Sequence, residues 1–172
     1  NAAASACEKG QDLEGALALL FEMESRRVHP DAVSYNAVIH VCGHHGQWLA
    51  ALQLLARMQR RGIQPTLVTF NALIGSCELQ AMWRCALDVM AQAQGSGLRA
   101  DALTYTAALS SGDKAEQWER TQRLLGDMSR AGPAPGLEHL NAGLSALHRG
   151  GHWTLTLDLF AELQRRRLQP DE

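Results

Sequence analysis

The residues best suited to chemistry in this chain are its histidines and cysteines. His40 and His44 lie four residues apart, a spacing that can place two imidazoles on one helix face and bind zinc. The pattern H-E-x-x-H is not met, however, and no third ligand is obvious. Three cysteines recur at intervals of 35 residues, which would stack them too far apart for shared ligation: Cys7, Cys42 and Cys77. We therefore expect buried packing cysteines, no metal and no cofactor.

Catalytic groupings are also not apparent in the sequence. No cluster of carboxylates looks able to hold Mg²⁺, and no pairing of a nucleophile with a base recurs along the chain. The sequence therefore predicts a chain that is not an enzyme and has no small-molecule substrate.

Residues of the same type recur every 35 residues at many other positions. Four tryptophans are spaced by this interval: Trp48, Trp83, Trp118 and Trp153. A second column is mainly aromatic: Tyr35, Phe70, Tyr105 and Leu140. A third is mainly asparagine: Asn1, Asn36, Asn71, Thr106 and Asn141. A fourth follows a column rich in proline: Asp31, Thr66, Asp101, Gly136 and Asp171. Several columns in one register indicate a structural repeat.

The elements that must position these columns are pairs of helices. The repeats run over 1–31, which is partial, then 32–66, 67–101, 102–136 and 137–171. Within 32–66, apolar residues at helical spacing predict two helices that bury one stripe each. One pair cannot bury its stripes alone, whereas stacked pairs can. The predicted fold is an all-α solenoid of stacked helix-turn-helix repeats in a right-handed superhelix, with 1–172 a single array cut from a longer protein.

Local signals place the ends of these helices. Ser34 is a candidate N-cap of a first helix, and the second helix of that repeat is expected to begin near Gln47. Gly62 is expected to supply a left-handed cap at its end, and Gly97 and Gly132 recur at that position. The tryptophans, at the starts of second helices, are expected to form a buried or half-buried ladder between repeats.

The composition of the chain limits the kinds of partner that it can bind. Lys and Arg total 16, Asp and Glu total 18, and the formal charge is −2, which excludes a chain-wide cationic field. Hydrophobic residues make up 46% and charged residues 20%, so the chain is not a disordered polyelectrolyte. No apolar run approaches the roughly 18 residues of a membrane span, so no membrane role is expected.

Motifs within the repeats resemble the pentatricopeptide repeat in its P-type form. Ala32–Thr66 reads AVSYNAVIHVCGHHGQWLAALQLLARMQRRGIQPT, and the next repeat opens LVTFNALI. The V-T-F/Y-N-x-L-I opening, the A-L-x-L-L/F second helix and the G-I-x-P-D close are visible. The resemblance covers all five units and is weakest in 102–136. The tetratricopeptide repeat fits less well, because the period here is 35 and its L-G-x-x-Y element is missing.

The resemblance implies selective binding of single-stranded RNA, one base per repeat. In this family the first helices line the concave face, and the Asn-column residue with the residue closing its repeat reads the base edge. An aliphatic residue packs against base faces. Carried over by position, the RNA-binding residues are Asn1, Asp31, Val33, Asn36, Thr66, Val68, Asn71, Asp101, Leu103, Thr106, Gly136, Asn141 and Asp171. The implied core is 5′-U-Y-U-R-U-3′.

Three further expectations concern the function of the chain. An alternative function is a helical scaffold that binds a protein or peptide partner on its concave face. The expected concave face is nearly neutral, because its few cations, such as Lys114 and Arg149, are matched by acids such as Glu78 and Asp113. The resemblance also implies RNA processing, stability or translation in a mitochondrion or plastid, although the chain shows no targeting segment.

Overall fold

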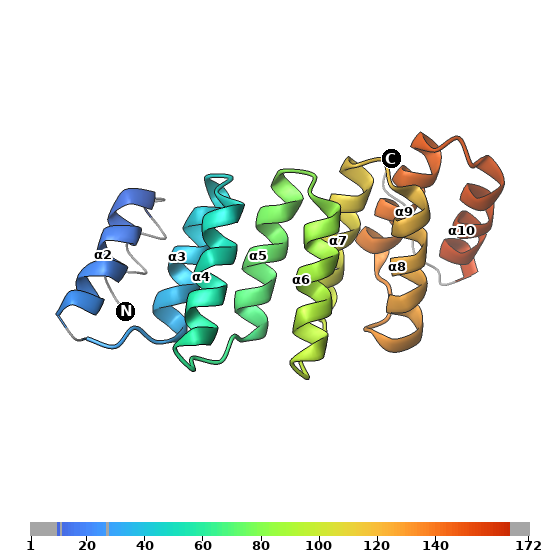
Figure 1. Ribbon diagram of the computed structural model, residues 1–172. Coiled ribbons are helices and arrows are strands. Elements are labelled where there is room, and N and C mark those ends of the chain that lie inside the picture. The colour runs from blue at the N-terminus through green and yellow to red at the C-terminus, as the bar shows by residue number, and fades with distance from the viewer. Residues whose placement is uncertain (1–9, 11, 27, 166–172) are drawn as a thin grey trace.

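The computed structural model describes residues 10, 12–26 and 28–165. Its described part is helical, without strands, and forms a row of helix pairs (Figure 1). The first helices of repeats two to five are α3 (Ala32–His44), α5 (Leu67–Leu79), α7 (Ala102–Lys114) and α9 (Leu137–Arg149). The second helices are α2 (Leu13–Ser25), α4 (Trp48–Arg60), α6 (Trp83–Gly95), α8 (Trp118–Ala131) and α10 (Trp153–Arg165). None of these helices is both long and apolar enough to cross a bilayer.

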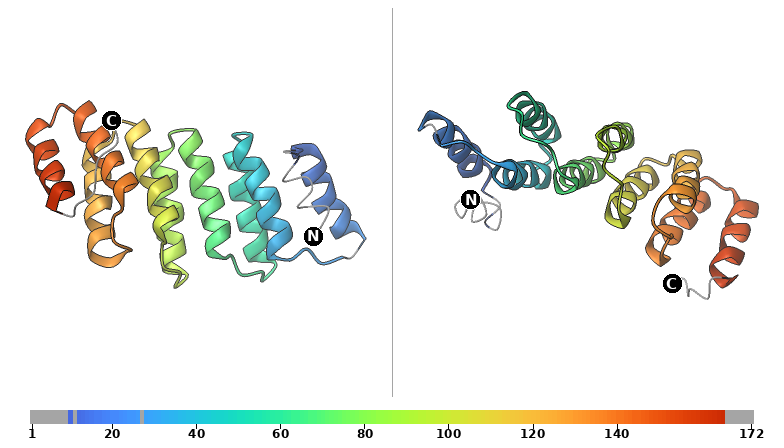
Figure 2. Two further views of the ribbon diagram at one scale, coloured as in Figure 1. Left: turned by 180° about the vertical axis from the view of Figure 1, so that it is seen from behind. Right: turned by 90° about the horizontal axis from the view of Figure 1, so that it is seen from below.

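The helices form two layers (Figure 2). Each first helix packs against the first helices of neighbouring repeats, as α3 does against α5 and α5 against α7. The second helices pack mainly against first helices: α4 and α6 each contact α5. This arrangement confirms the predicted all-α repeat solenoid, because the stripes of one helix pair are covered only when the next pair stacks on it.

The core lies between the two layers. Tyr35, Phe70, Tyr105 and Leu140, the mainly aromatic column, are all buried. The second helices contribute aliphatic side chains, joined by a buried methionine on α4, α6 and α8; on α4 the buried residues include Leu54, Leu55 and Met58. A residue spaced by one repeat therefore occupies the same place in successive layers of one continuous core.

Helix starts show which residues act as caps. Asp31 caps α3, and its Oδ1 accepts a hydrogen bond of 2.9 Å from the backbone N–H of Ser34. Asp101 caps α7 in the same way, through the backbone N–H of Thr104 at 2.8 Å. The prediction that Ser34 is the N-cap is therefore wrong, because the helix begins three residues earlier and Ser34 occupies its first turn. Gln47 precedes α4, as predicted.

Where the structure describes the turn after a helix, a left-handed residue follows every helix except α8. Gly62 and Gly97 have φ of 72° and 78°, as expected of left-handed caps. Gly132 instead has φ of −102° and an extended backbone, so the predicted cap is wrong at this repeat. Helix α8 has 14 residues where the other second helices have 13. The following Pro133 also favours an extended conformation at Gly132.

The tryptophan column is half-buried in three repeats and exposed in the fourth. Arg120 of the next repeat lies over the Trp83 ring at 5.7 Å, and the His152 ring lies 3.6 Å from Trp118 between centroids. Trp153 is 71% exposed, so the predicted ladder is wrong there. Residues of the following repeat thus cover part of the indoles of Trp83 and Trp118, whereas α10 is the last described helix.

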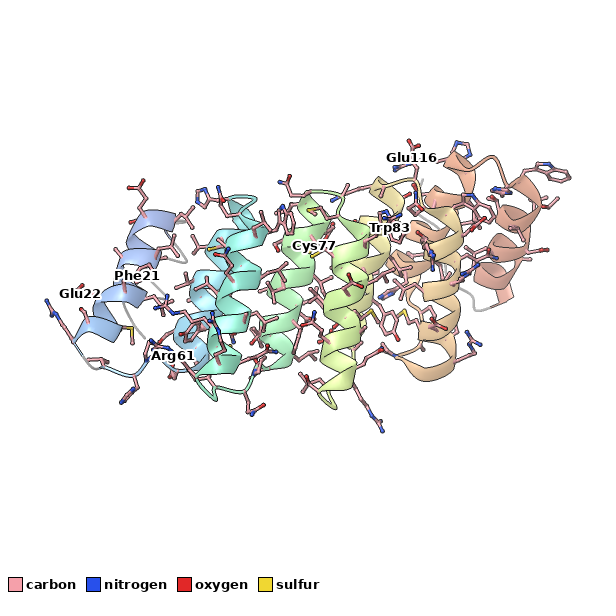
Figure 3. All side chains as sticks on the ribbon, in the orientation of Figure 1. Phe21, Glu22, Arg61, Cys77, Trp83 and Glu116 are labelled. Atoms are coloured by element: carbon pink, nitrogen blue, oxygen red, sulfur yellow. The ribbon has the colours of Figure 1, made fainter. Side chains whose placement is uncertain are left out.

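The cysteines pack as small side chains. Cys42 and Cys77 are buried, and the Cys77 thiol donates to Cys85 Sγ at 3.1 Å. Figure 3 places Cys77 and Trp83 near the end of the α5–α6 pair where the turn lies. Burial raises the pKa of the Cys77 thiol, and the contact with Cys85 raises it further. A thiol that stays protonated is a poor nucleophile and metal ligand. Cys7 lies outside the described residues.

Candidate nucleic-acid interface

A groove of about 630 Å³ runs across the first helices α3, α5 and α7. Its lining includes five of the residues that the sequence predicted for RNA binding: Val33, Asn36, Val68, Asn71 and Leu103. The three aliphatic side chains are more than half exposed, at 57%, 64% and 64%. The exposed aliphatic groups can contact the flat, apolar face of a planar ligand. The amides beside them can form hydrogen bonds with its polar edge.

The most complete polar site in this groove surrounds Asn71. Its Nδ2 lies 3.3 Å from each carboxylate oxygen of Asp101, the residue that closes the same repeat. Its Oδ1 lies 2.6 Å from the hydroxyl oxygen of Thr104, which is also 2.7 Å from Asp101 Oδ1. The Thr104 hydroxyl has a single proton, which it can donate to Asn71 Oδ1 or to Asp101 Oδ1. The amide is therefore held at both ends, and its orientation is fixed.

This arrangement leaves Asn71 a mixed hydrogen-bonding edge. A primary amide has two N–H donors and a carbonyl with two lone pairs. One donor faces Asp101 and one lone pair faces Thr104, so one donor and one acceptor remain for a ligand in the groove. Such a pair of groups can bond to a base edge that presents the complementary acceptor and donor.

The charge of Asp101 is also set by this network. Burial raises the pKa of the Asp101 carboxyl, but hydrogen bonds from Thr104 and Asn71 lower it by more. The net pKa lies below its ordinary value of 3.8, so Asp101 is ionised at neutral pH. An ionised carboxylate can only accept hydrogen bonds, which is why it selects the amino end of the Asn71 amide.

The Asn36 site repeats the pattern with a neutral closing residue. Asn36 Nδ2 donates to the hydroxyl of Thr66 at 3.4 Å, and its Oδ1 accepts from the hydroxyl of Thr69 at 2.6 Å. The backbone N–H of Thr66 donates to the same Thr69 hydroxyl at 3.0 Å. The amide is held as at Asn71, but without a charge beside it.

The fourth repeat departs from this design. Gly136 has no side chain, and the position of Thr69 and Thr104 is taken by His139, which is 2% exposed. His139 Nδ1 accepts from the backbone N–H of Gly136 at 3.1 Å. Its Nε2 lies 3.1 Å from the hydroxyl of Thr106. The same hydroxyl lies 3.3 Å from a carboxylate oxygen of Glu138.

The other predicted residues lie as follows. Asp31 is occupied in capping α3, and Asn141 is half-buried on α9. Thr106, Gly136 and Asn141 are not among the residues that line the groove. Asn1 and Asp171 lie outside the described residues, so two of the five predicted pairs have one described partner each.

Sequence reasoning missed Thr69 and Thr104, which hold the Asn36 and Asn71 amides in place. They belong to one column of the repeat, in the first turn of each first helix: Ser34, Thr69, Thr104 and His139. All four are buried polar residues. Their 35-residue spacing could have indicated a shared role, but the contact joins residues 33 apart in sequence, which no local pattern reveals.

Cations near the first-helix ends are engaged by acids of the preceding repeat. Lys114 Nζ lies 3.0 Å from Glu78 Oε1, and Arg149 lies 3.1 Å from Asp113 Oδ2. Ser110 and Ser145 bond to the same two carboxylates. These ion pairs leave less positive charge available for phosphates than the residue count suggests. Across the described residues, no group of three or more His, Cys, Asp or Glu side chains could hold a metal ion.

The comparisons with known families match the N-terminal half of the chain. Residues 30–78 match the PPR repeat family, and residues 5–45 match the Pentatricopeptide repeat domain. No curated protein sequence matches the chain. Among solved structures, the pentatricopeptide repeat protein PPR10 in complex with an 18-nt psaJ RNA element superposes with a TM-score of 0.79. Together these matches support the assignment of the chain to the pentatricopeptide repeat family.

Solved structures of pentatricopeptide repeat proteins share this fold along the whole chain. The PPR10–RNA complex is 24% identical and covers 98% of this chain, which spans 25% of that protein. PPR10 from maize is 26% identical over 96% of this chain and 24% of its own, with a TM-score of 0.79. The PPR domain of Arabidopsis thaliana protein-only RNase P 1, in complex with tRNA, is 17% identical, covers 98% of this chain and 89% of its own, and has a TM-score of 0.85.

Proposed function

We propose that this pentatricopeptide repeat chain is a sequence-selective module for single-stranded RNA, reading one base per repeat along the first helices. The observation that carries the proposal is the Asn71 site, where Asp101 and Thr104 hold an amide beside the exposed aliphatic side chains of the groove. Two similar solved proteins, PPR10 and the PPR domain of protein-only RNase P 1, are in complex with RNA, which supports the proposal.

The proposed reading frame assigns one base to each repeat. With RNA running 5′ to 3′ as the protein runs from N- to C-terminus, the core is 5′-U-Y-U-R-U-3′. A uracil edge presents a ring N–H beside a carbonyl, which complements the donor and acceptor left on Asn71. The same assignment follows for Asn1 with Asp31 and Asn141 with Asp171. Asn36 with Thr66 reads a pyrimidine, and Thr106 with Gly136 reads a purine. The aliphatic side chains contact base faces.

The wider role is part of the same proposal. We place residues 1–172 in one array, with repeats over 1–31, 32–66, 67–101, 102–136 and 137–171. The chain itself binds RNA and does no chemistry on it. Family membership favours a mitochondrial or plastid protein that acts in RNA processing, stability or translation, although one similar solved structure is a nuclear RNase P.

The groove is better suited to base recognition than to phosphate binding. Two of its neighbouring cations are paired with Glu78 and Asp113, and its lining is mostly apolar. Phosphate contacts make affinity fall steeply with salt, so an interface with few free cations should show a shallow salt dependence. Binding by the isolated chain is expected to be weak and is best measured at low salt.

The test is equilibrium binding to short RNAs that differ only at the base opposite Asn71. We expect uracil to be preferred over the other bases by about fivefold or more, because one base-edge contact discriminates by about 1–3 kcal/mol. Asn71→Thr should shift that preference towards a purine. Gln94→Thr, which changes an exposed residue on α6, should leave it unchanged.

A lack of base preference in the parent chain, or no shift in Asn71→Thr, would contradict base reading. The alternative is then a scaffold for a protein or peptide partner on the same groove. Its mostly apolar lining and its neutralised cations favour that second candidate.

A further inference from the structure

We propose that Glu138 is a specificity-determining residue of the fourth repeat, where its carboxylate and the Thr106 hydroxyl together select guanine. This inference rests on the proposed function and narrows the purine of that repeat to one base. It assigns a reading role to a residue outside the pairs described above, at a column occupied elsewhere by aliphatic side chains.

The position of Glu138 in the repeat is the first observation. It stands 35 residues after Leu103, in the column of Val33 and Val68, whose side chains line the groove. Its own side chain is 66% exposed and charged. A carboxylate therefore occupies the place at which the preceding repeats present a branched apolar group to the proposed base faces.

Contact with the preceding repeat is the second observation. Glu138 Oε1 lies 3.3 Å from the hydroxyl oxygen of Thr106, which occupies the column of Asn36 and Asn71. In the third repeat, the carboxylate beside the reading residue comes from Asp101. The corresponding residue of the fourth repeat is Gly136, so Glu138 supplies an acidic group from two positions further along the chain.

The hydrogen-bonding state of Thr106 follows from His139. The Nδ1 atom of that ring accepts from the Gly136 N–H, so a neutral ring carries its proton on Nε2. Nε2 lies 3.1 Å from both the Thr106 hydroxyl and the Ala102 carbonyl oxygen. Its proton can therefore be donated to Thr106, which has only one proton of its own.

The Thr106 proton is directed to oxygens of the protein. The Ala102 carbonyl oxygen lies 3.0 Å from the hydroxyl, and Glu138 Oε1 lies 3.3 Å from it. Once that proton is donated to either oxygen, the hydroxyl can offer a ligand only a lone pair. The Glu138 carboxylate also offers only lone pairs. The site around Thr106 therefore offers a ligand only hydrogen-bond acceptors, and we call it an acceptor edge. Asn71, in contrast, offers one donor and one acceptor.

An acceptor edge selects the base with two neighbouring donors. Guanine presents a ring N–H next to an exocyclic amino group on its Watson–Crick edge, and a carboxylate with an adjacent hydroxyl lone pair can accept from both. Adenine and cytosine each place a ring lone pair next to their amino group, and uracil places carbonyl oxygens on both sides of its ring N–H. Each of these three bases would set an acceptor against an acceptor, which disfavours binding.

The experiment uses the 172-residue chain and four RNAs, 5′-UCUNU-3′, in which N is each base in turn. At low salt we expect guanine at N to bind about fivefold or more tightly than adenine, cytosine or uracil. Glu138→Gln replaces one acceptor by a donor, so the preference for guanine should fall to less than about twofold. Glu138→Val, which restores the aliphatic type of the column, should also abolish it.

Controls separate this inference from the proposed function. Glu119→Gln changes an exposed carboxylate on α8 and should leave every preference unchanged. The uracil preference opposite Asn71 should persist in both Glu138 variants. If the uracil preference is present but the RNA with guanine at N binds no more tightly than the other three, the inference fails and the proposed function stands. If no RNA shows any base preference, both fail.

One further result would overturn the role of Glu138 specifically. If Glu138→Gln strengthens binding to all four RNAs by the same factor, the carboxylate only repels the RNA and does not select a base. Circular dichroism of each variant checks that the helices are retained, and this is expected because Glu138 is largely solvent-exposed.

Discussion

The sites around Asn71 and Thr106 occupy the same place in consecutive repeats but differ in hydrogen-bonding character. At Asn71, the Asp101 carboxylate and the Thr104 hydroxyl hold an amide that keeps one donor and one acceptor. At Thr106, a histidine ring and a glutamate surround a hydroxyl that keeps only an acceptor. The backbone around both sites is alike: Asp101 and Gly136 have φ of −92° and −85°, with ψ near 180°. One scaffold thus carries two chemically different edges through changes at four positions of the repeat.

The largest effect should come from the shared scaffold beneath the two sites. Phe70 and Tyr105, which precede Asn71 and Thr106, are 0% and 3% exposed. Phe70→Ala should lower the free energy of unfolding by about 3–5 kcal/mol, because it removes a buried ring and leaves a cavity. Tyr105→Ala should cause a loss of similar size. Urea denaturation followed by circular dichroism measures both. A small loss in only one variant would show that the two repeats do not share a common core.

The buried hydroxyl that holds Asn71 should have the next largest effect. Thr104→Val leaves the Asn71 carbonyl and the Asp101 carboxylate without that donor, so we expect a loss of about 1–3 kcal/mol in unfolding free energy. Base preference opposite Asn71 should weaken as well. Thr156→Val is the matched control, because its hydroxyl bonds only to the carbonyl of His152 in the same segment. Equal losses in the two variants would contradict the role assigned to Thr104.

Asp101 makes the stability of the third repeat depend on pH, whereas the corresponding residue of the fourth repeat, Gly136, has no ionisable side chain. The pKa of this carboxyl is lowered in the folded chain, so ionisation favours folding above the ordinary value of 3.8. This contribution is lost as pH falls through the lowered pKa. We expect ¹³C-detected carboxyl titration by NMR to place the pKa of Asp101 below 3.8. In Thr104→Val the pKa should move upward, and an unchanged value would show that the hydroxyl does not stabilise the charge.

The smallest effect is expected from making the fourth repeat resemble the third. Gly136→Asp introduces an N-cap side chain at a backbone conformation already adopted by Asp101. The nearest atom to the new Cβ is His139 Nδ1 at 3.6 Å, an ordinary contact. Replacing glycine by aspartate at an N-cap stabilises a helix by a few tenths of a kcal/mol, so the thermal midpoint should rise slightly. A fall in the midpoint would show that the His139 ring excludes a side chain there.

The sequence predicts most of the fold because each column of the repeat recurs several times along the chain. The aromatic column at Tyr35 and Phe70 is buried as its periodicity indicates, and the helix pairs follow the 35-residue units. The errors arise where one repeat departs from its neighbours. Gly132 precedes a proline and follows a longer helix, and Trp153 has no described repeat beyond it to pack against.

The candidate site is harder to predict because its key contacts cross between repeats. Asn71 and Asp101 were identified through the family resemblance, but the role of Thr104 depends on a hydroxyl that meets an amide 33 residues earlier. Glu138 and His139 pose the same difficulty, since their types alone suggest an ordinary exposed acid and a packed imidazole. Only the packing of α9 against α7 shows that both reach Thr106.

The most direct test of the account is whether RNA contacts the Asn36 and Asn71 amides. In ¹⁵N-labelled protein, the side-chain amide resonances of both residues should shift on titration with 5′-UCUGU-3′, while the amide of Gln94 on α6 stays unchanged. The methyl resonances of Val33, Val68 and Leu103 should shift with them, because those side chains share the groove. Shifts confined to another surface, with both amides unaffected at saturating RNA, would contradict the account.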